Sequence, residues 1–194
     1  MIALRYAIAI AGGIASGKSS VCNLLKLYGY SIIDADKIAH NALDVLKDEV
    51  VASFGSEIME SGNINRKKLG NIIFGDNAKK SVLEGILHPF IRSEILQRAH
   101  DLERYGKPYF IDIPLFFEVK EKYKVPRILL IYTPRASQIQ RLIKRDGISE
   151  SMALKRIESQ MDIESKRALS TDIIDNSRDF AYTKLQVEEL LRTL

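Results

Sequence analysis

A glycine-rich stretch near the N-terminus, residues 12–19, limits the possible folds of this chain more than any other part of the sequence. It reads GGIASGKS and matches the phosphate-binding pattern G-x-x-x-x-G-K-[ST]. The apolar residues 6–11 before it predict a buried strand, and the apolar residues after it recur at helical spacing. A strand that leads through this loop into a helix is the setting in which the pattern binds nucleotide phosphates. A chance glycine-rich turn, the alternative, would not be expected to have that setting.

The residues of this loop predict ATP and Mg²⁺ as cofactors. The glycines let backbone N–H groups turn towards phosphate oxygens, and the helix that follows directs the positive end of its dipole at the anion. Lys18 is expected to reach the β- and γ-phosphates and to act in catalysis, and the Ser19 hydroxyl is expected to bind Mg²⁺. The ATP-binding residues predicted in the loop are Gly13, Ile14, Ala15, Ser16, Gly17, Lys18, Ser19 and Ser20.

The remainder of the chain alternates between short apolar strands and helical segments. Further strands are predicted at 31–34, 109–112, 128–132 and 172–175. Since parallel neighbours need crossover connections, the pattern predicts an α/β fold of the P-loop NTPase type, a doubly wound five-stranded parallel sheet. We expect one domain, 1–194, with its core at 1–35 and 107–194. An almost wholly helical insert at about 36–106 is expected to form a substrate lobe, and a lid is expected at about 138–168.

Acidic side chains follow two of these strands at their carboxyl ends, where such sheets bind ligands. Asp34 and Asp36 close the second strand, which we expect next to the first and therefore beside the loop. Asp36 is predicted to orient an acceptor hydroxyl and take its proton, with a helix N-cap as the alternative. Asp34 is expected to have a structural role or to lie in the outer shell of the metal ion. Asp112 ends the third strand and is predicted to bind Mg²⁺ together with Ser19, unless it caps the next helix.

Two arginines lie four residues apart on the helix after the fourth strand. Arg141 and Arg145 therefore share one helix face, and such a pair can clamp a nucleotide and neutralise transition-state charge. Arg141 is predicted to bind the nucleotide and Arg145 to act in catalysis. The alternative is a solvated basic stripe balanced by Asp146.

Composition narrows the class of partner. The 29 Lys and Arg against 25 Asp and Glu give a net charge of +4, interleaved along the chain, which favours acidic small molecules over nucleic acid. The single cysteine, Cys22, excludes an intramolecular disulfide and a Cys-based zinc cluster, and we interpret it as a core residue. No segment approaches the roughly 20 apolar residues of a membrane span, and no cleavable signal precedes the loop. We expect a cytoplasmic protein, with a monomer favoured.

Taken together, these motifs resemble the dephospho-CoA kinase family. The family's glycine-rich loop and the D-A-D after its second strand appear here at 11–20 and 34–36. Its L-H-P-x-I appears at 87–91, its P-L-L-x-E at 114–118, its lid pattern Q-x-x-R-x-x-x-R-D at 138–146 and its I-D-N at 174–176. The match spans nearly the whole chain in the same order. The departures are Ala11 for Thr, Ala15 for Gly, Ser20 for Thr and Phe116 for Leu.

The resemblance implies a kinase that uses ATP to phosphorylate the ribose 3′-hydroxyl of dephospho-CoA, the last step of coenzyme A synthesis. It implies that Asp36 is the catalytic aspartate, that the insert binds the pantetheine-bearing substrate, and that the lid closes over ATP. The substrate-binding residues expected on this basis are Asp36, His88, Arg66, Pro114 and Leu115. Asn176 is expected to bind the nucleotide beside Arg141. Taken alone, His88 is more simply a surface residue and Arg66 a solvated helix start.

Two alternatives remain at the level of sequence. Another nucleoside or nucleotide kinase of this fold would have the same loop and a different acceptor pocket. A GTPase-type switch would need an N-K-x-D motif, but the nearest segment, residues 176–179, reads NSRD and lacks the lysine.

Overall fold

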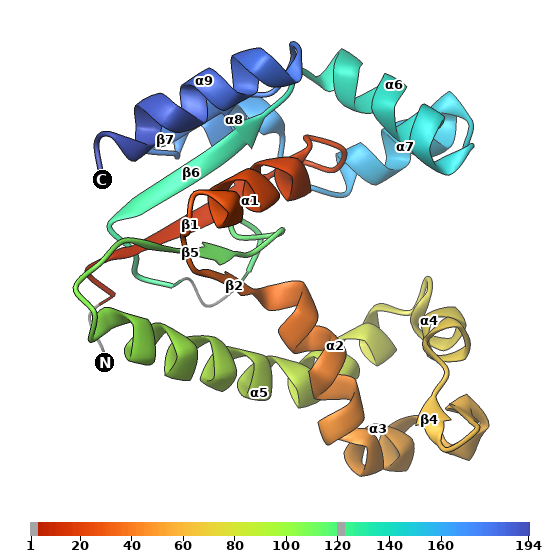
Figure 1. The fold of residues 1–194 in the computed structure, drawn as a ribbon. Coiled ribbons are helices and arrows are strands. Elements are labelled where there is room, and N and C mark those ends of the chain that lie inside the picture. Colours follow the sequence, from red (N-terminus) through yellow and green to blue (C-terminus); the bar gives the residue numbers. More distant parts are fainter. Residues whose placement is uncertain (1–3, 120–122) are drawn as a thin grey trace. The chain divides into compact units, whose positions relative to one another are not determined.

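The sheet at the centre of the fold has the strand order β2-β5-β1-β6-β7 (Figure 1). The computed structural model describes residues 4–119 and 123–194. In these residues the five strands are β1 (Ala7–Gly12), β2 (Ile32–Asp34), β5 (Tyr109–Asp112), β6 (Arg127–Tyr132) and β7 (Asp172–Asp175). β1 pairs in parallel with β5 and β6, and β6 pairs in parallel with β7. The predicted α/β class and five-stranded sheet are confirmed.

Helices pack on both faces of this sheet, as a doubly wound fold requires. Their bounds are α1 (Lys18–Leu27), α6 (Arg135–Asp146), α7 (Glu150–Glu158), α8 (Ile163–Ala168) and α9 (Phe180–Leu191). On one face, α1 and α9 bury Leu25 and Val187 against Ile10, Phe110 and Leu129 of the strands. α8 contacts β6 and lies behind it in Figure 1, on the other side from α1. This packing fixes the carboxyl end of β1, from which the glycine-rich loop starts.

The predicted place of the second strand was wrong. We expected β2 beside β1, but β5 lies between them and β2 is at the edge. The burial explains the order, since Tyr109, Phe110 and Ile111 of β5 are at most 1% exposed and need a neighbour on each side. β2 has only three residues, two of them partly exposed, which suits an edge strand.

The chain divides into two compact units, Met1–Ile33 with Ala99–Leu194 and Asp34–Arg98. The insert expected at about 36–106 begins near the start of the second unit but extends past its end. The reason is that one helix, α5 (Asn77–Glu103), continues from the second unit into the first. At its end the Glu103 carboxylate accepts hydrogen bonds from the backbone N–H groups of Arg5 and Tyr6, both at 3.0 Å. These bonds attach the last turn of α5 to the segment that leads into β1.

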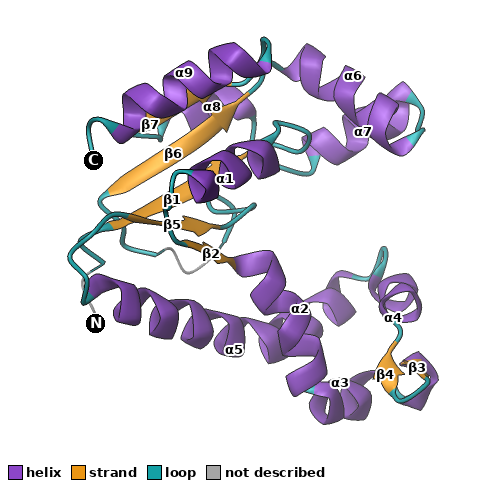
Figure 2. Cartoon of the chain, in the orientation of Figure 1, coloured by secondary structure: helices purple, strands orange, loops and turns teal. Residues whose placement is uncertain are grey.

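The second unit is mostly helical, with one short hairpin that the sequence did not predict (Figure 2). Its other elements are α2 (Ala35–Val45), α3 (Lys47–Phe54), the 3₁₀ helix η1 (Ser56–Ile58), β3 (Met59–Glu60), β4 (Asn63–Ile64) and α4 (Arg66–Ile73). Ser61 and Gly62 turn the hairpin with φ angles of 49° and 83°. The Ser-Gly pair is a turn signal, but two-residue strands are too short to show alternating hydrophobicity.

The second unit has a hydrophobic core of its own. It is formed by Val50, Phe54, Ile58 and their buried neighbours, and Ile72, Ile73 and Leu87 pack against it. Phe74, at 90% exposure, points away from this core. Among the described residues of the whole chain, no helix is both long enough and apolar enough to cross a membrane.

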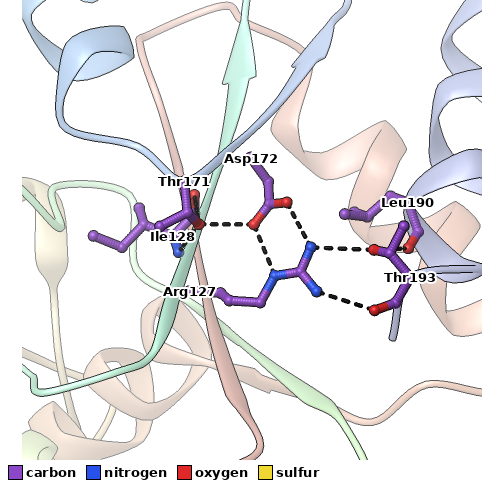
Figure 3. Close-up of polar contacts among 6 residues, drawn as sticks. All are labelled: Arg127, Ile128, Thr171, Asp172, Leu190 and Thr193. Atoms are coloured by element: carbon purple, nitrogen blue, oxygen red, sulfur yellow. Dashed lines mark hydrogen bonds and ion pairs between the residues drawn. The ribbon is translucent and has the colours of Figure 1, made fainter.

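An ionic clamp joins the first residues of β6 and β7 (Figure 3). It therefore lies at the amino ends of these parallel strands, whereas the glycine-rich loop follows the carboxyl end of β1. The Arg127 guanidinium donates to Asp172 from Nε at 2.9 Å and from Nη2 at 2.5 Å. It also donates to the hydroxyl and carbonyl oxygens of Thr193 near the C-terminus. The Thr171 hydroxyl donates to the same Asp172 carboxylate at 2.7 Å. The clamp therefore holds the end of the chain to the sheet.

Asp172→Asn is expected to lower the free energy of unfolding by about 1–3 kcal/mol at pH 7, the scale of a hydrogen-bonded charge that loses its partner. The bond from Arg127 is the largest of the effects that hold the pKa of Asp172 below its usual value. The stabilisation is therefore complete above the unfolded pKa of about 3.9, and is lost as the pH falls through the lower folded pKa. Denaturant titrations should show a gap between variant and wild type that closes below about pH 4. An exposed acid on α9, replaced in Glu189→Gln, is the control, and a gap that persists at low pH would contradict the clamp.

Candidate active site

The glycine-rich loop runs from the end of β1 to the start of α1 and needs unusual backbone angles. Gly17, the N-cap residue of α1, has φ of 84°, and a Cβ there would lie 2.0 Å from Asn176 Nδ2. Ala15 also has a positive φ, 59°, although it is not a glycine. Among the described residues no side chain caps α1. The N-terminus of a ten-residue helix is thus left with free N–H groups and a positive dipole end, which suits an anion.

Lys18 and Asp112 meet beside this loop. Lys18 Nζ donates to Asp112 Oδ1, and the two side chains are 15% and 13% exposed. Cys22 Sγ, one turn along α1, donates to Asp112 Oδ2 at 3.4 Å. Burial raises the pKa of this thiol to about 12, with the Asp112 charge as the next cause, so it stays a neutral donor at pH 7. The structure therefore brings together the predicted catalytic lysine and the predicted metal-binding carboxylate.

Asp112 and Ser19 carry oxygen atoms of the kind that Mg²⁺ binds. Asp112 offers a carboxylate, and Ser19 lies exposed on the first turn of α1. In the described part of the chain, no group of three or more His, Cys, Asp or Glu side chains forms a metal cage. Mg²⁺ does not need one, since it usually binds one or two protein oxygens, substrate phosphates and water.

Residues at the carboxyl ends of β6 and β7 support the loop from its other side. Asn176 Nδ2 donates to the Ser16 carbonyl at 2.7 Å, and the Thr133 hydroxyl lies 3.2 Å from the same oxygen. Arg141 donates to the Asn176 carbonyl at 2.7 Å and to Thr133 Oγ1 at 3.3 Å. The two residues predicted to bind the nucleotide beyond the loop, Arg141 and Asn176, are thus bonded to each other next to it.

Arg145, one helical turn further along α6, has a different partner. Its Nε donates to Asp146 at 2.7 Å, and Arg156 of α7 donates to the same carboxylate at 2.6 Å. The Arg145 side chain is 57% exposed. This pairing corresponds to the alternative that the sequence left open, a basic stripe balanced by Asp146. Arg145 is not bonded to the loop here.

Of the residues predicted to bind the acceptor, Asp36, Arg66 and His88 lie in the second unit. Asp36 is exposed on the first turn of α2, and Asp34 is the N-cap that accepts a bond from Lys37 N at 3.0 Å. The capping role considered for Asp36 therefore belongs to Asp34. Arg66 begins α4 and donates to the His40 carbonyl at 3.4 Å, and His88 is exposed on α5.

Pro114 and Leu115 lie in the turn after β5, in the first unit. Leu115 is 43% exposed, whereas the next two residues, Phe116 and Phe117, are buried. Pro114 is half-buried, so Leu115 has the more open side chain of the two residues predicted to bind substrate here.

Sequence reasoning missed two residues that touch the loop. Gln160 accepts a bond from Ile14 N, and Lys166 donates to the Gly12 carbonyl. They are 146 and 154 residues away from their partners, and no local pattern signals such contacts. Both become visible only once the fold is known.

A family model described as dephospho-CoA kinase matches residues 6–181. The chain belongs to the dephospho-CoA kinase family. A dephospho-CoA kinase of Helicobacter pylori (strain J99) is 50% identical over 193 residues, which cover 98% of each protein. The resemblance inferred from the motifs is confirmed, and the chain is a kinase of coenzyme A biosynthesis.

Solved structures agree with this membership. A dephospho-CoA kinase from Campylobacter jejuni is 32% identical, with 98% of each chain covered and a TM-score of 0.73. A protein from Thermus thermophilus is 30% identical over 98% of each chain, with a TM-score of 0.83. A nucleoside kinase and a GTPase-type switch are therefore not favoured.

Proposed function

We propose that this member of the dephospho-CoA kinase family transfers the γ-phosphoryl group of ATP to the ribose 3′-hydroxyl of dephospho-CoA. The new bond joins the 3′-oxygen to the γ-phosphorus, the bond to the β–γ bridging oxygen breaks, and ADP and CoA leave. The observation that supports this most is the uncapped N-terminus of α1 with Lys18 and Asp112 beside it. We further propose that the protein works in the cytoplasm as a monomer.

The loop residues bind and orient ATP in this scheme. Backbone N–H groups of the loop that are not already bonded within the described part of the protein, those of Gly17, Lys18 and Ser19 among them, donate to phosphate oxygens. The Lys18 ammonium moves from Asp112 to the β- and γ-phosphates, which carry more negative charge. That movement leaves the Asp112 carboxylate to bind the metal together with Ser19. When bound, Mg²⁺ neutralises phosphate charge. Cys22 keeps its bond to Asp112 Oδ2 and so limits the rotation of that carboxylate.

The arginines supply positive charge from α6. Arg141 is already fixed by Thr133 and Asn176, and we propose that it and Asn176 line the nucleotide site. Arg145 is proposed to neutralise transition-state charge, for which it must leave Asp146. Asp146 keeps Arg156 as a partner when this happens, which reduces the cost of the exchange.

The acceptor is proposed to be oriented by Asp36, which takes the proton of the 3′-hydroxyl as the phosphoryl group arrives. Further substrate contacts are proposed for Arg66 and His88, whose side chains offer a positive charge and a hydrogen-bonding ring. Pro114 and Leu115 are proposed to offer apolar contact after β5.

An acceptor panel tests the reaction. Purified protein with Mg-ATP is given dephospho-CoA, adenosine, AMP, CMP, uridine or water, and ADP release is followed. Dephospho-CoA is expected to react at least about 100-fold faster than any other member, equivalent to roughly 2.7 kcal/mol in transition-state binding. Phosphorus NMR should show the product as a 3′-monoester. Preferential use of a nucleoside or of AMP would refute the proposed acceptor, and ATP hydrolysis indifferent to every acceptor would refute the transfer itself.

A further inference from the structure

Two side chains that come after α7 hold the first residues of the glycine-rich loop by its backbone. Gln160 Oε1 accepts a hydrogen bond from Ile14 N at 2.9 Å. Lys166 Nζ donates to the Gly12 carbonyl at 3.2 Å, and the Lys166 side chain is fully buried. Because both contacts are to backbone atoms, they fix the path of the loop rather than the side chains along it.

The buried charge of Lys166 is paired by Glu118. Lys166 Nζ lies 2.8 Å from Glu118 Oε1, and the same oxygen accepts a bond from Met161 N at 3.0 Å. Burying an ammonium without a partner costs several kcal/mol, so this pair holds Lys166 firmly in place. Glu118 thereby ties the stretch 160–166 to the turn after β5.

The start of α6 touches the same part of the loop. Gln138 is buried, and its Nε2 donates to the Thr133 carbonyl at 3.0 Å. A Cβ on Gly13 would lie 2.7 Å from that nitrogen, so the Gln138 amide packs directly on the Gly13 backbone. Residues 12–14 are therefore contacted both by the beginning of α6 and by the stretch after α7. Between these two attachments lie most of α6 and all of α7, which contact each other and carry Arg141 and Arg145.

The glycine-rich loop needs this support because Ala15, which follows residues 12–14, has a strained backbone. Ala15 has a left-handed φ of 59°, which costs a residue with a Cβ about 1–2 kcal/mol. A strained backbone of this kind persists where its surroundings hold it. The bond from Ile14 N to Gln160 fixes the Gly13–Ile14 peptide group, one residue before Ala15.

We propose that Gln160 is a positioning residue for the nucleotide, with Lys166 and Glu118 as its support. It keeps the loop in its phosphate-binding shape before ATP arrives, so less order has to be imposed on binding. The same bond connects the loop to the end of α7, so that phosphate binding and the α6–α7 segment act on each other. This role rests on the proposed function only in taking ATP as the ligand of the loop.

The test compares Gln160→Leu, which removes the acceptor, with Gln160→Glu, which keeps an oxygen for Ile14 N. Gln140→Leu, an exposed glutamine on α6, is the matched control. Gln160→Leu is expected to weaken ATP binding by about tenfold, the scale of one lost hydrogen bond, and to raise KM for ATP while KM for dephospho-CoA stays unchanged. Gln160→Glu should restore slow hydrogen exchange of the Ile14 amide, although its charge opposes the phosphates, and the control should match wild type in ATP affinity. A fall in melting temperature without a change in ATP affinity, or an equal rise in both KM values, would overturn the proposal.

Two further measurements keep the result clear. Hydrogen exchange by NMR should show the Ile14 amide exchanging faster in Gln160→Leu without nucleotide, and an unchanged rate would overturn the proposal. The double variant Lys166→Met with Glu118→Gln removes both buried charges together, and it should also weaken ATP binding; wild-type affinity would refute the supporting pair. Calorimetric ATP binding needs no acceptor, so these results stand even if the acceptor panel refutes dephospho-CoA.

Discussion

Lys18→Ala is expected to leave the fold intact and to lower turnover by roughly 10³-fold or more, the scale of a lost transition-state charge clamp. The fold should survive because Lys18 lies at the first position of α1, outside the hydrophobic core of the sheet. Turnover should fall because this ammonium is the charge that reaches the γ-phosphate in the proposed scheme. Steady-state kinetics with dephospho-CoA and circular dichroism measure the two effects.

The ion pair with Asp112 calls for a second variant. Removing Lys18 alone leaves a carboxylate that is only 13% exposed without its cation. This local charge imbalance would disturb the site on its own. The double variant Lys18→Ala with Asp112→Asn removes that imbalance, and circular dichroism should again show an intact fold. Its turnover should be at least as low as that of the single variant, because Asp112 is also a proposed metal ligand. Lys26→Ala, an exposed lysine in the last turn of the same helix, is the control. Turnover near wild type in Lys18→Ala would end the argument for a catalytic loop.

The features that the sequence predicted correctly are those encoded by neighbouring residues. The strand before the loop, the loop and α1 follow one another along the chain, and each has its own signal in hydrophobic spacing or glycines. The meeting of Lys18 and Asp112 was foreseen in part, because carboxyl ends of parallel strands share one edge. The positive φ of Ala15 was not foreseen, although the family pattern has a glycine at that position.

The features that it missed depend on residues far apart in the chain. The hydrophobic pattern of β2 says that it is a strand and nothing about its neighbours, so its place beyond β5 required the fold. Lys166 would ordinarily be expected in solvent, because a lysine is seldom buried without a partner. Its burial depends on Glu118 and the Gly12 carbonyl, neither of which is near it in sequence.

The second unit shows the same limit in another way. The helical insert is rich in apolar residues, and of these Ile72, Ile73 and Leu87 pack against the core of the unit, whereas Phe74 is exposed. Spacing alone cannot separate the apolar residues that a small lobe needs for itself from those it offers to a ligand. That distinction came only from burial.

Asp36→Asn is expected to separate chemistry from binding. A positioned base contributes about 10²–10⁴ in rate, so kcat should fall by that order while ATP affinity changes little. The amide keeps the size of the carboxylate and can still hydrogen-bond a hydroxyl, but it cannot take the proton. The structure removes one objection, since Asp34 and not Asp36 is the side chain that caps α2. The cost to the helix should therefore include no lost cap, and the loss of a favourable charge in its first turn contributes about 0.3–1 kcal/mol.

Two matched variants make this test decisive. Asp44→Asn removes an exposed acid near the other end of α2 and should leave kcat unchanged. Asp34→Asn keeps a capping side chain, because asparagine caps helices about as well as aspartate, so α2 should stay intact. Calorimetry gives ATP affinity for each variant, and single-turnover kinetics give the rate of the chemical step. If Asp36→Asn lost its ATP affinity together with its rate, or kept wild-type kcat, Asp36 would not be the base, and the acceptor proton would have to go to another group.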